Sequence, residues 1–165
     1  MTITEILAIL AMTAWAVYRQ TRAARLGLDG SRFKLAIIYA VVGVAVGGFD
    51  PPAGTLGWAM IGLGLALSLV VGLVRGRRTR IWIDDAGAVW SRGTALTVGL
   101  FLGLIATKFA LGTAAYVLGI DDGAGFGEVL VMIAIMIAVQ AEIVHRRALV
   151  AVASDRSTQP VGLPA

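Results

Sequence analysis

The 165-residue chain is 58% hydrophobic and only 15% charged, whereas soluble domains carry about 25% charged residues. This composition, with a mean hydropathy of +0.86, predicts an integral membrane protein. The net charge of +4 does not indicate nucleic-acid binding, because the cations lie almost entirely in short connections between apolar runs.

The chain contains no cysteine and a single histidine, His145. Disulfides, thiolate metal sites, a two-histidine haem and a multi-histidine zinc site are therefore excluded. No glycine-rich phosphate loop, carboxylate dyad or nucleophile–base set is evident, so we expect neither a catalytic site nor a cofactor. His145 stands among arginines at a helix end and is expected to be interfacial, beside an ordinary helix-surface pair of Glu142 and Arg146.

Apolar runs predict an all-α transmembrane bundle of five helices in a single domain spanning residues 1–147. The first run lacks the positive start and the cleavage site of a signal peptide, so we interpret it as a retained helix. Pro51 and Pro52 end the second run, because tandem proline cannot continue a helix. A tail over 148–165 is expected to be largely disordered at its end. The five helices are predicted over 3–18, 35–49, 55–74, 94–119 and 126–144.

The distribution of charge predicts the orientation of the five helices. The connections 19–34 and 75–93 hold five cations each, and the segment after the last helix holds three. The remaining connections hold Asp50, Asp121 and Asp122 and no cation. By the positive-inside rule the N-terminus lies outside and the C-terminus inside, and the arginine-rich composition favours a bacterial cytoplasmic membrane.

The segment 75–93 is the longest polar interval. Its parts 79–84 and 88–92 are rich in β-branched and aromatic residues and flank Asp85-Ala86-Gly87, which predicts a cytoplasmic β-hairpin with a glycine at positive φ. The hairpin should lean on the bilayer or on other loops, since two strands alone are marginally stable. Its cations and tryptophans either set topology alone or also contact anionic lipid headgroups or a protein partner. These residues are Arg75, Arg77, Arg78, Arg80, Trp82, Trp90 and Arg92.

Small residues at four-residue spacing occur in several predicted helices. In lipid such spacing allows backbones to approach, so it indicates helix packing. Packing within the bundle is the plain interpretation. A sharper one is that the ridge of the fourth helix forms a homodimer or contacts a larger membrane-protein partner. The positions are Gly43 and Gly47; Gly64, Ser68 and Gly72; and Gly99, Gly103 and Thr107.

Lys108 lies near the middle of the fourth predicted helix, where an ammonium group costs about 2.5–3.5 kcal/mol on insertion scales. We therefore expect a polar partner, and Glu128 at the start of the fifth helix is the strongest candidate for a structural ion pair. Two alternatives stay open: Lys108 binds an anionic or quinone-like ligand or a proton, or it faces lipid and snorkels.

The layout of the chain is similar to that of the CcdC-like family of small bacterial membrane proteins, across about residues 1–147. The shared features are an arginine-rich turn, a short strand pair, Trp90-Ser-Arg-Gly93 leading into a helix with a mid-span cation, and Pro51-Pro52 in the preceding outer loop. The resemblance implies a five-helix protein associated by genomic context with cytochrome c biogenesis, with no activity assigned. It matches Lys108 to a basic residue of the fourth helix and Glu128 to an acidic residue that starts the fifth.

These observations predict a non-enzymatic accessory or assembly factor that acts by helix packing. The alternative is a small transporter or ligand-binding membrane protein centred on Lys108. The surroundings of Lys108 discriminate between them: a closed salt bridge favours the scaffold, and a hydrated cavity favours ligand handling.

Overall fold

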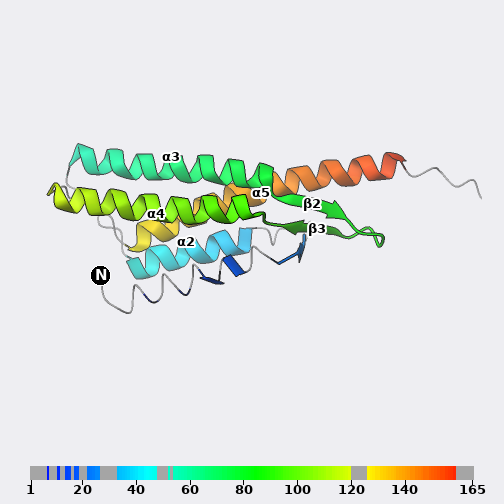
Figure 1. The fold of residues 1–165 in the computed structure, drawn as a ribbon, viewed down its shortest axis with the longest axis horizontal. Helices are drawn as coiled ribbons and strands as arrows, with labels where there is room; N and C mark the ends of the chain where they lie inside the picture. The colour runs from blue at the N-terminus through cyan, green and yellow to red at the C-terminus, as the bar shows by residue number, and fades with distance from the viewer. Residues whose placement is uncertain are drawn as a thin grey trace, which may run out of the picture.

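The computed structural model describes six positions between Leu7 and Tyr18, residues 22–26, 33–47, 52, 54–119 and 126–158. Within this part of the chain there are four helices and three short strands (Figure 1). Most of the first predicted helix, 3–18, lies outside the described residues, as do Asp50, Asp121 and Asp122. The elements are α2 (Lys34–Gly47), α3 (Thr55–Arg78), α4 (Ala95–Val117), α5 (Phe126–Thr158), β1 (Ala24–Arg25), β2 (Arg80–Ile83) and β3 (Val89–Arg92).

Among the described residues, three helices are long and apolar enough to cross a membrane: α3, α4 and α5. The fourth, α2, has 14 residues and a length of about 21 Å, which is shorter than the hydrocarbon core of about 30 Å. The prediction of a multi-pass helical protein is therefore confirmed, while the count of five spans exceeds what the described residues show.

The long helix α5 is the centre of the bundle, because both α2 and α3 pack along it. One hydrophobic core joins Tyr39 of α2, Phe101 and Leu104 of α4, and an apolar face of α5 that includes Met132 and Met136. The helix α4 also contacts α3 and runs antiparallel to it, as Figure 1 shows.

Small residues of α2 and α3 allow these helices to approach α5 closely. A Cβ added at Gly72 would lie 2.7 Å from the backbone oxygen of Met136, and one at Gly43 would lie 3.0 Å from that of Gly127. Ser68 is fully buried, and its hydroxyl group donates a hydrogen bond to the carbonyl oxygen of Gly64 at 2.9 Å. Gly43, Gly64, Ser68 and Gly72 are therefore all buried, and the three glycines lie at close approaches to α5; the surroundings of Gly47 are outside the described part.

The fifth predicted helix was expected to end at Val144, and this prediction is wrong. The helix α5 continues to Thr158 and, with 33 residues, is about 50 Å long, well beyond the hydrocarbon core. The reason is that apolar positions continue at helical spacing across the arginines: Val144 before them and Ala148 after them are both buried. Ala148 is fully buried even though it follows two cations, so this extension has a face to bury.

The predicted hairpin is confirmed. Strands β2 and β3 pair antiparallel with Trp82 opposite Trp90, and Gly87 adopts a φ of 76° in the turn. The third strand, β1, was not predicted: Ala24 pairs with Ser91 and Arg25 with Trp90, which gives the order β1-β3-β2. A third strand supplies the support that a two-stranded hairpin lacks.

The hairpin extends along the C-terminal part of α5, as Figure 1 shows, and β2 contacts that helix. Along the strands the exposure alternates: Val89 is buried, while Arg80, Trp82 and Arg92 are exposed. Because strand side chains alternate between faces, one face packs inward and the other carries arginine and tryptophan. The hairpin therefore leans on α5 and on β1, and β1 comes from one of the other connections that the sequence suggested as a support.

Candidate functional site

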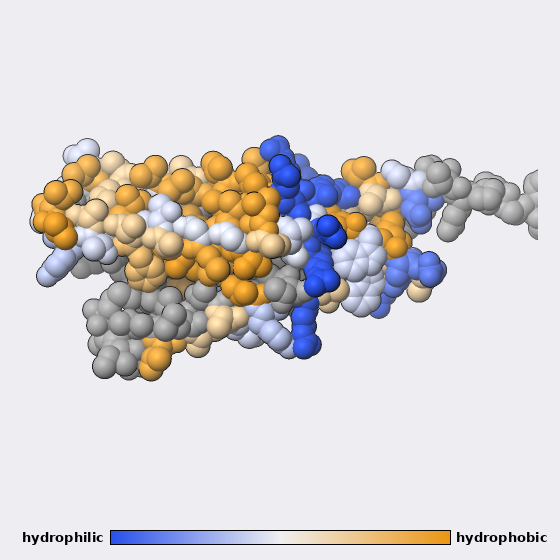
Figure 2. Space-filling model, viewed as in Figure 1, coloured by the Kyte–Doolittle hydropathy of each residue, from blue (hydrophilic) through white to orange (hydrophobic). Residues whose placement is uncertain are grey.

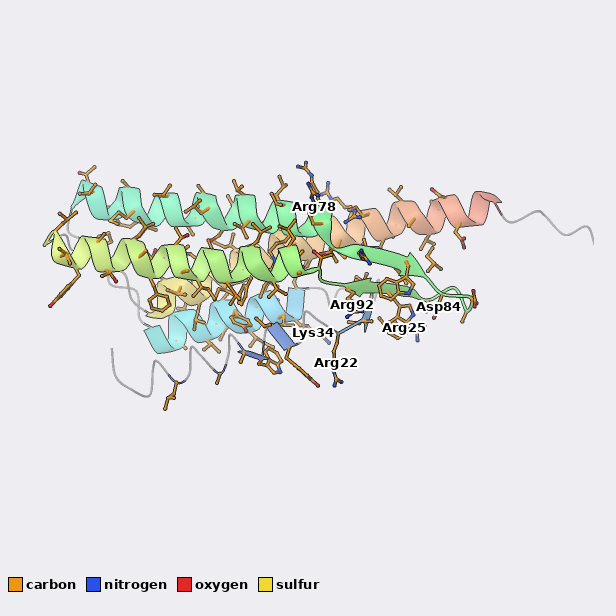
Figure 3. All side chains as sticks on the ribbon, viewed as in Figure 1. Arg22, Arg25, Lys34, Arg78, Asp84 and Arg92 are labelled. Atoms are coloured by element: carbon orange, nitrogen blue, oxygen red, sulfur yellow. The ribbon has the colours of Figure 1, made fainter. Side chains whose placement is uncertain are left out.

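Cations gather where α2 begins, α3 ends and β3 ends. Figure 3 places Lys34, Arg78 and Arg92 at the same level along the molecule, and Figure 2 shows a hydrophilic band there that borders the apolar surface of the bundle. We call the exposed residues Lys34, Arg77, Arg78, Arg80 and Arg92 the basic belt. The hairpin between α3 and α4 contributes to this belt, because Arg78 before it and Arg92 at its end lie at the same level along the molecule.

Lys108 and Glu128 form an ion pair inside the bundle. Lys108 lies on the face of α4 that also carries Phe101 and Leu104, since these positions recur at three- and four-residue spacing. Its Nζ atom lies 2.7 Å from Oε1 of Glu128, and the side chains are only 5% and 12% exposed. The structure thus brings together the two residues that the sequence paired. The contact neutralises the charge that lies nearest the middle of α4.

The surroundings of Glu128 are tight. A Cβ at Gly64 would lie 3.7 Å from Oε1 of Glu128, so the glycine stripe of α3 leaves room for the carboxylate. Glu128 is in the first turn of α5, where the helix dipole favours a negative charge. Neither carboxylate oxygen accepts an aligned hydrogen bond from the described residues, so the ion pair with Lys108 is its main stabilising contact.

Arg75 is an exception among the predicted interfacial arginines, because it is buried and only 1% exposed. Its Nη1 donates to Sδ of Met136 at 3.0 Å, and its guanidinium carbon lies 5.2 Å from the centre of the Phe101 ring. The position explains the burial: Arg75 follows Ser68 and Gly72 on the face of α3 that packs on α5. Arg75 consequently belongs to the core between α3, α4 and α5, and not to the exposed cations around the hairpin.

The end of α3 is capped by α5, a contact that the sequence did not reveal. Arg147 donates through Nη1 to the carbonyl oxygens of Gly76, Arg77 and Thr79 at 2.7, 2.9 and 2.9 Å. The last carbonyl groups of a helix lack partners within it, so these three bonds satisfy them. In the sequence, a cation near the end of an apolar helix indicates that it could cap a helix end. Nothing in the sequence shows that Arg147 caps the end of α3.

His145 is buried, with 8% exposed, and its Nδ1 atom has no hydrogen-bond partner among the described residues. His145 therefore lies against the rest of the protein and not at an exposed helix end, and its expected position at the membrane interface stays a prediction. The predicted pair of Glu142 and Arg146 is present at 2.7 Å on an exposed surface. Within the described part of the chain no group of three or more potential metal ligands occurs.

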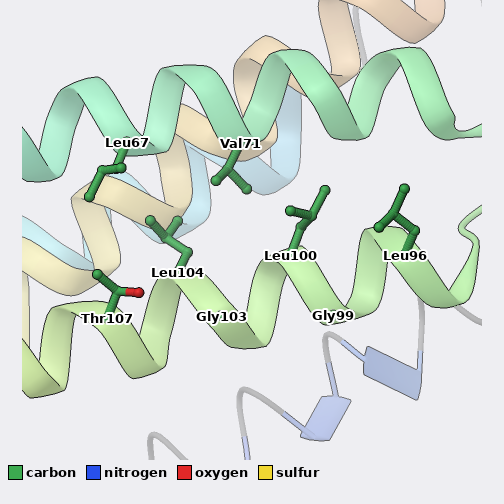
Figure 4. A pocket seen from close by; sticks show the side chains of 8 residues that line it. All are labelled: Leu67, Val71, Leu96, Gly99, Leu100, Gly103, Leu104 and Thr107. Carbon is green, nitrogen blue, oxygen red and sulfur yellow. The ribbon is translucent and has the colours of Figure 1, made fainter.

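Unlike Gly64 and Gly72 of α3, Gly99 and Gly103 of α4 do not pack against another described helix. Gly99, Gly103 and Thr107 are exposed, and a Cβ at either glycine would meet nothing within 4 Å. They line an apolar pocket of about 340 Å³ between α3 and α4 (Figure 4), together with residues such as Leu67 and Val71 of α3. Among the described residues, no helix packs against the predicted ridge of α4 at Gly99 and Gly103.

The hairpin turn is organised by Asp84, which lies outside the membrane-spanning helices. Its carboxylate accepts hydrogen bonds from Nε1 of Trp90 at 2.8 Å and from the backbone N–H groups of Ala88 and Ala86 at 2.7 and 3.1 Å. These bonds, with a smaller contribution from the charge of Arg25, outweigh partial burial and hold the pKa of Asp84 below its ordinary value of 3.8. Trp90 therefore orders the turn, and Trp82 remains exposed on the same face.

The fold and these contacts define a small polytopic membrane protein whose helices are packed through small residues and one internal ion pair. No known protein family, curated protein or solved structure matches the chain. The resemblance to the CcdC-like family remains a prediction from the layout of the sequence.

Proposed function

We propose that the chain is a small non-catalytic accessory or assembly protein of the bacterial cytoplasmic membrane, acting through helix packing and through its basic belt. The observation that carries this proposal is the closed contact between Lys108 and Glu128. A neutralised lysine in a tightly packed site stabilises a scaffold and offers no free charge to a ligand. The plain structural role of the pair is therefore favoured.

The proposed orientation places the basic belt in the cytoplasm, with five spans and the N-terminus outside. The gathering of Lys34, Arg78 and Arg92 at one level supports it, because the positive-inside rule then acts on one end of the bundle. The chain has no cysteine, so single substitutions can be labelled cleanly. Ala86→Cys in the hairpin should react with an impermeant maleimide only from the cytoplasmic side, and Gly54→Cys before α3 only from outside. The reverse pattern would contradict the orientation.

Purification from native membranes tests the accessory role. The chain should retain a membrane-protein partner at constant stoichiometry, and the neutral double variant Lys108→Met with Glu128→Gln should retain it equally, because the ion pair serves the fold alone. The resemblance to the CcdC-like family makes proteins of cytochrome c biogenesis the first partners to test. Absence of any stoichiometric partner would count against the proposal.

A ligand-binding protein or small transporter centred on Lys108 is the second candidate. One observation favours it: both carboxylate oxygens of Glu128 lack an aligned hydrogen bond among the described residues. In that case the double neutral variant would fold and keep its partners, yet lose the cellular activity that depends on the chain. The accessory protein would keep that activity.

A further inference from the structure

The apolar pocket between α3 and α4 lies on the surface of two membrane-spanning helices. Leu67 and Val71 border it on α3, and Leu96, Gly99, Gly103 and Thr107 are among its residues on α4, as Figure 4 shows. Its volume of about 340 Å³ is at the small end of the range for ligand pockets. Because a Cβ at Gly99 or Gly103 would meet no atom within 4 Å, no described residue fills the space beside these two glycines.

One end of this groove meets the basic belt. Leu96 is the second residue of α4, so it lies directly beyond the strand end that carries Arg92. Arg80 is the cross-strand partner of Arg92, and Arg78 ends α3 beside them. Like charges placed opposite each other on neighbouring strands repel, so an anion between them is stabilising. In the part of the chain that the structure describes, the side chains of Arg78 and Arg80 enter no ion pair.

We propose that the groove and the arginines at its end form one binding site for an anionic phospholipid. An acyl chain fills the groove between α3 and α4, and the phosphate lies among the guanidinium groups of Arg78, Arg80 and Arg92. The positive end of the α4 dipole faces the same level and adds to the attraction. The site goes beyond the accessory role and depends only on the membrane placement of the two helices.

Charge decides between a lipid and a second copy of the chain as the occupant. A two-fold dimer through α4, with its axis along the membrane normal, would place the basic belts of both copies at one level. Arginines would then face arginines across the interface. A phospholipid brings the opposite charge to the belt and an apolar chain to the groove, and it therefore complements both parts.

Native mass spectrometry of the full chain in mild detergent tests this site. The protein is offered an equimolar mixture of phosphatidylglycerol and phosphatidylcholine with identical acyl chains. One phosphatidylglycerol should be retained per chain, with a preference of about tenfold or more over phosphatidylcholine, since each arginine near an anionic surface contributes attraction. This comparison needs no variant and therefore does not depend on a mutant folding.

Matched variants then locate the lipid. Gly103→Leu fills the groove and should abolish the retained phosphatidylglycerol, whereas Gly62→Leu adds the same side chain to an open position of α3 outside the groove and should leave it unchanged. Thr107→Leu provides a second filling variant. The double variant Arg78→Gln with Arg80→Gln should lose the preference about tenfold, while Arg146→Gln, whose charge is paired with Glu142, should not.

Three results would overturn the proposal. Equal retention of both lipids would remove the headgroup site. Unchanged retention in both groove-filling variants would place the lipid elsewhere. A dimer mass that disappears in Gly103→Leu, with no lipid bound, would show that the groove is a helix–helix interface between two copies.

Discussion

The helices α3 and α4 are neighbours of similar length, and both carry small residues at four-residue spacing, yet they are held in different ways. In α3 the stripe of Gly64, Ser68 and Gly72 is buried against α5. In α4 the stripe of Gly99 and Gly103 faces open space. The inner face of α4 joins the bundle through Phe101, Leu104 and the ion pair of Lys108.

This difference shows that a small-residue stripe permits close approach but does not select a partner. What selects it in α3 is α5, which brings the backbone of Met136 against Gly72 and the side chain of Met132 against Gly64. In α4 the stripe and the ion pair belong to different faces of the helix: Lys108 points into the bundle, and Gly99 and Gly103 are exposed. The contrast can be broken at four places, each with a different expected loss of stability.

The largest effect is expected at the ion pair. Lys108→Met leaves the Glu128 carboxylate buried without a counter-charge and should reduce the free energy of unfolding by about 3–5 kcal/mol. The exchange of Lys108→Glu with Glu128→Lys should recover much of this loss. Reversible unfolding of the purified protein in detergent measures both.

The exposed pair of Glu142 and Arg146 provides the control, because its nitrogen and oxygen are also 2.7 Å apart. Glu142→Gln should cost less than about 1 kcal/mol, since solvent screens this pair. An equal cost for the two pairs would show that burial does not govern the contribution of Lys108.

The second largest difference in stability is expected between the glycine stripes of α3 and α4. In Gly72→Val the new Cβ would lie 2.7 Å from a backbone oxygen, so α3 must move from α5, and a loss of about 3 kcal/mol is expected. Gly103→Val has open space and should change stability by less than about 0.5 kcal/mol. The same unfolding assay in detergent compares them. A large loss at Gly103 would indicate that α4 has a partner under the assay conditions.

Much of this architecture could be predicted from the sequence. The apolar runs located α3, α4 and the start of α5 because the bilayer requires long uncharged stretches. Asp85-Ala86-Gly87 located the hairpin because only glycine adopts positive φ easily, and Gly87 does so. The partner of Lys108 could be inferred because few acidic residues lie within reach of a charge that lipid cannot solvate.

Other features depended on tertiary contacts that no local pattern records. The strand β1 has two residues in a polar connection, and it exists because β3 offers a free edge. From the sequence alone, Arg75 is grouped with the exposed cations of the hairpin segment by its charge, although its place on the Ser68–Gly72 face of α3 was the signal for burial. The extension of α5 beyond Val144 needed the sheet as a surface to cover, and the sheet was only partly foreseen.

The ends of α3 and α4 provide a smaller contrast. The start of α4 is capped locally by Thr94, whose side chain accepts the N–H of Thr97, whereas the end of α3 is capped from α5 by Arg147. Arg147→Met should cost about 2 kcal/mol, because it removes charged hydrogen bonds to three carbonyl groups. Thr94→Ala should cost about 1 kcal/mol. Amide hydrogen exchange at the end of α3 should become faster in Arg147→Met and not in Thr94→Ala. Faster exchange at the start of α4 in Arg147→Met, with the end of α3 unchanged, would contradict the capping of α3 by Arg147.

The smallest effect is expected in the hairpin that connects the two helices, and it depends on pH. Because the pKa of Asp84 is lower in the folded hairpin than its ordinary value of 3.8, the carboxylate stabilises the turn fully above about pH 4, and this contribution is lost as the pH falls through the lower, folded value. The near-ultraviolet circular dichroism of the Trp82–Trp90 pair should therefore stay constant from pH 7 to about pH 4 and then decline. The helical signal of α3 and α4 should not change over the same range, since the bonds of Asp84 lie within the hairpin. Asp84→Asn should remove this pH dependence, and a decline that persists unchanged in that variant would assign it to a different carboxylate.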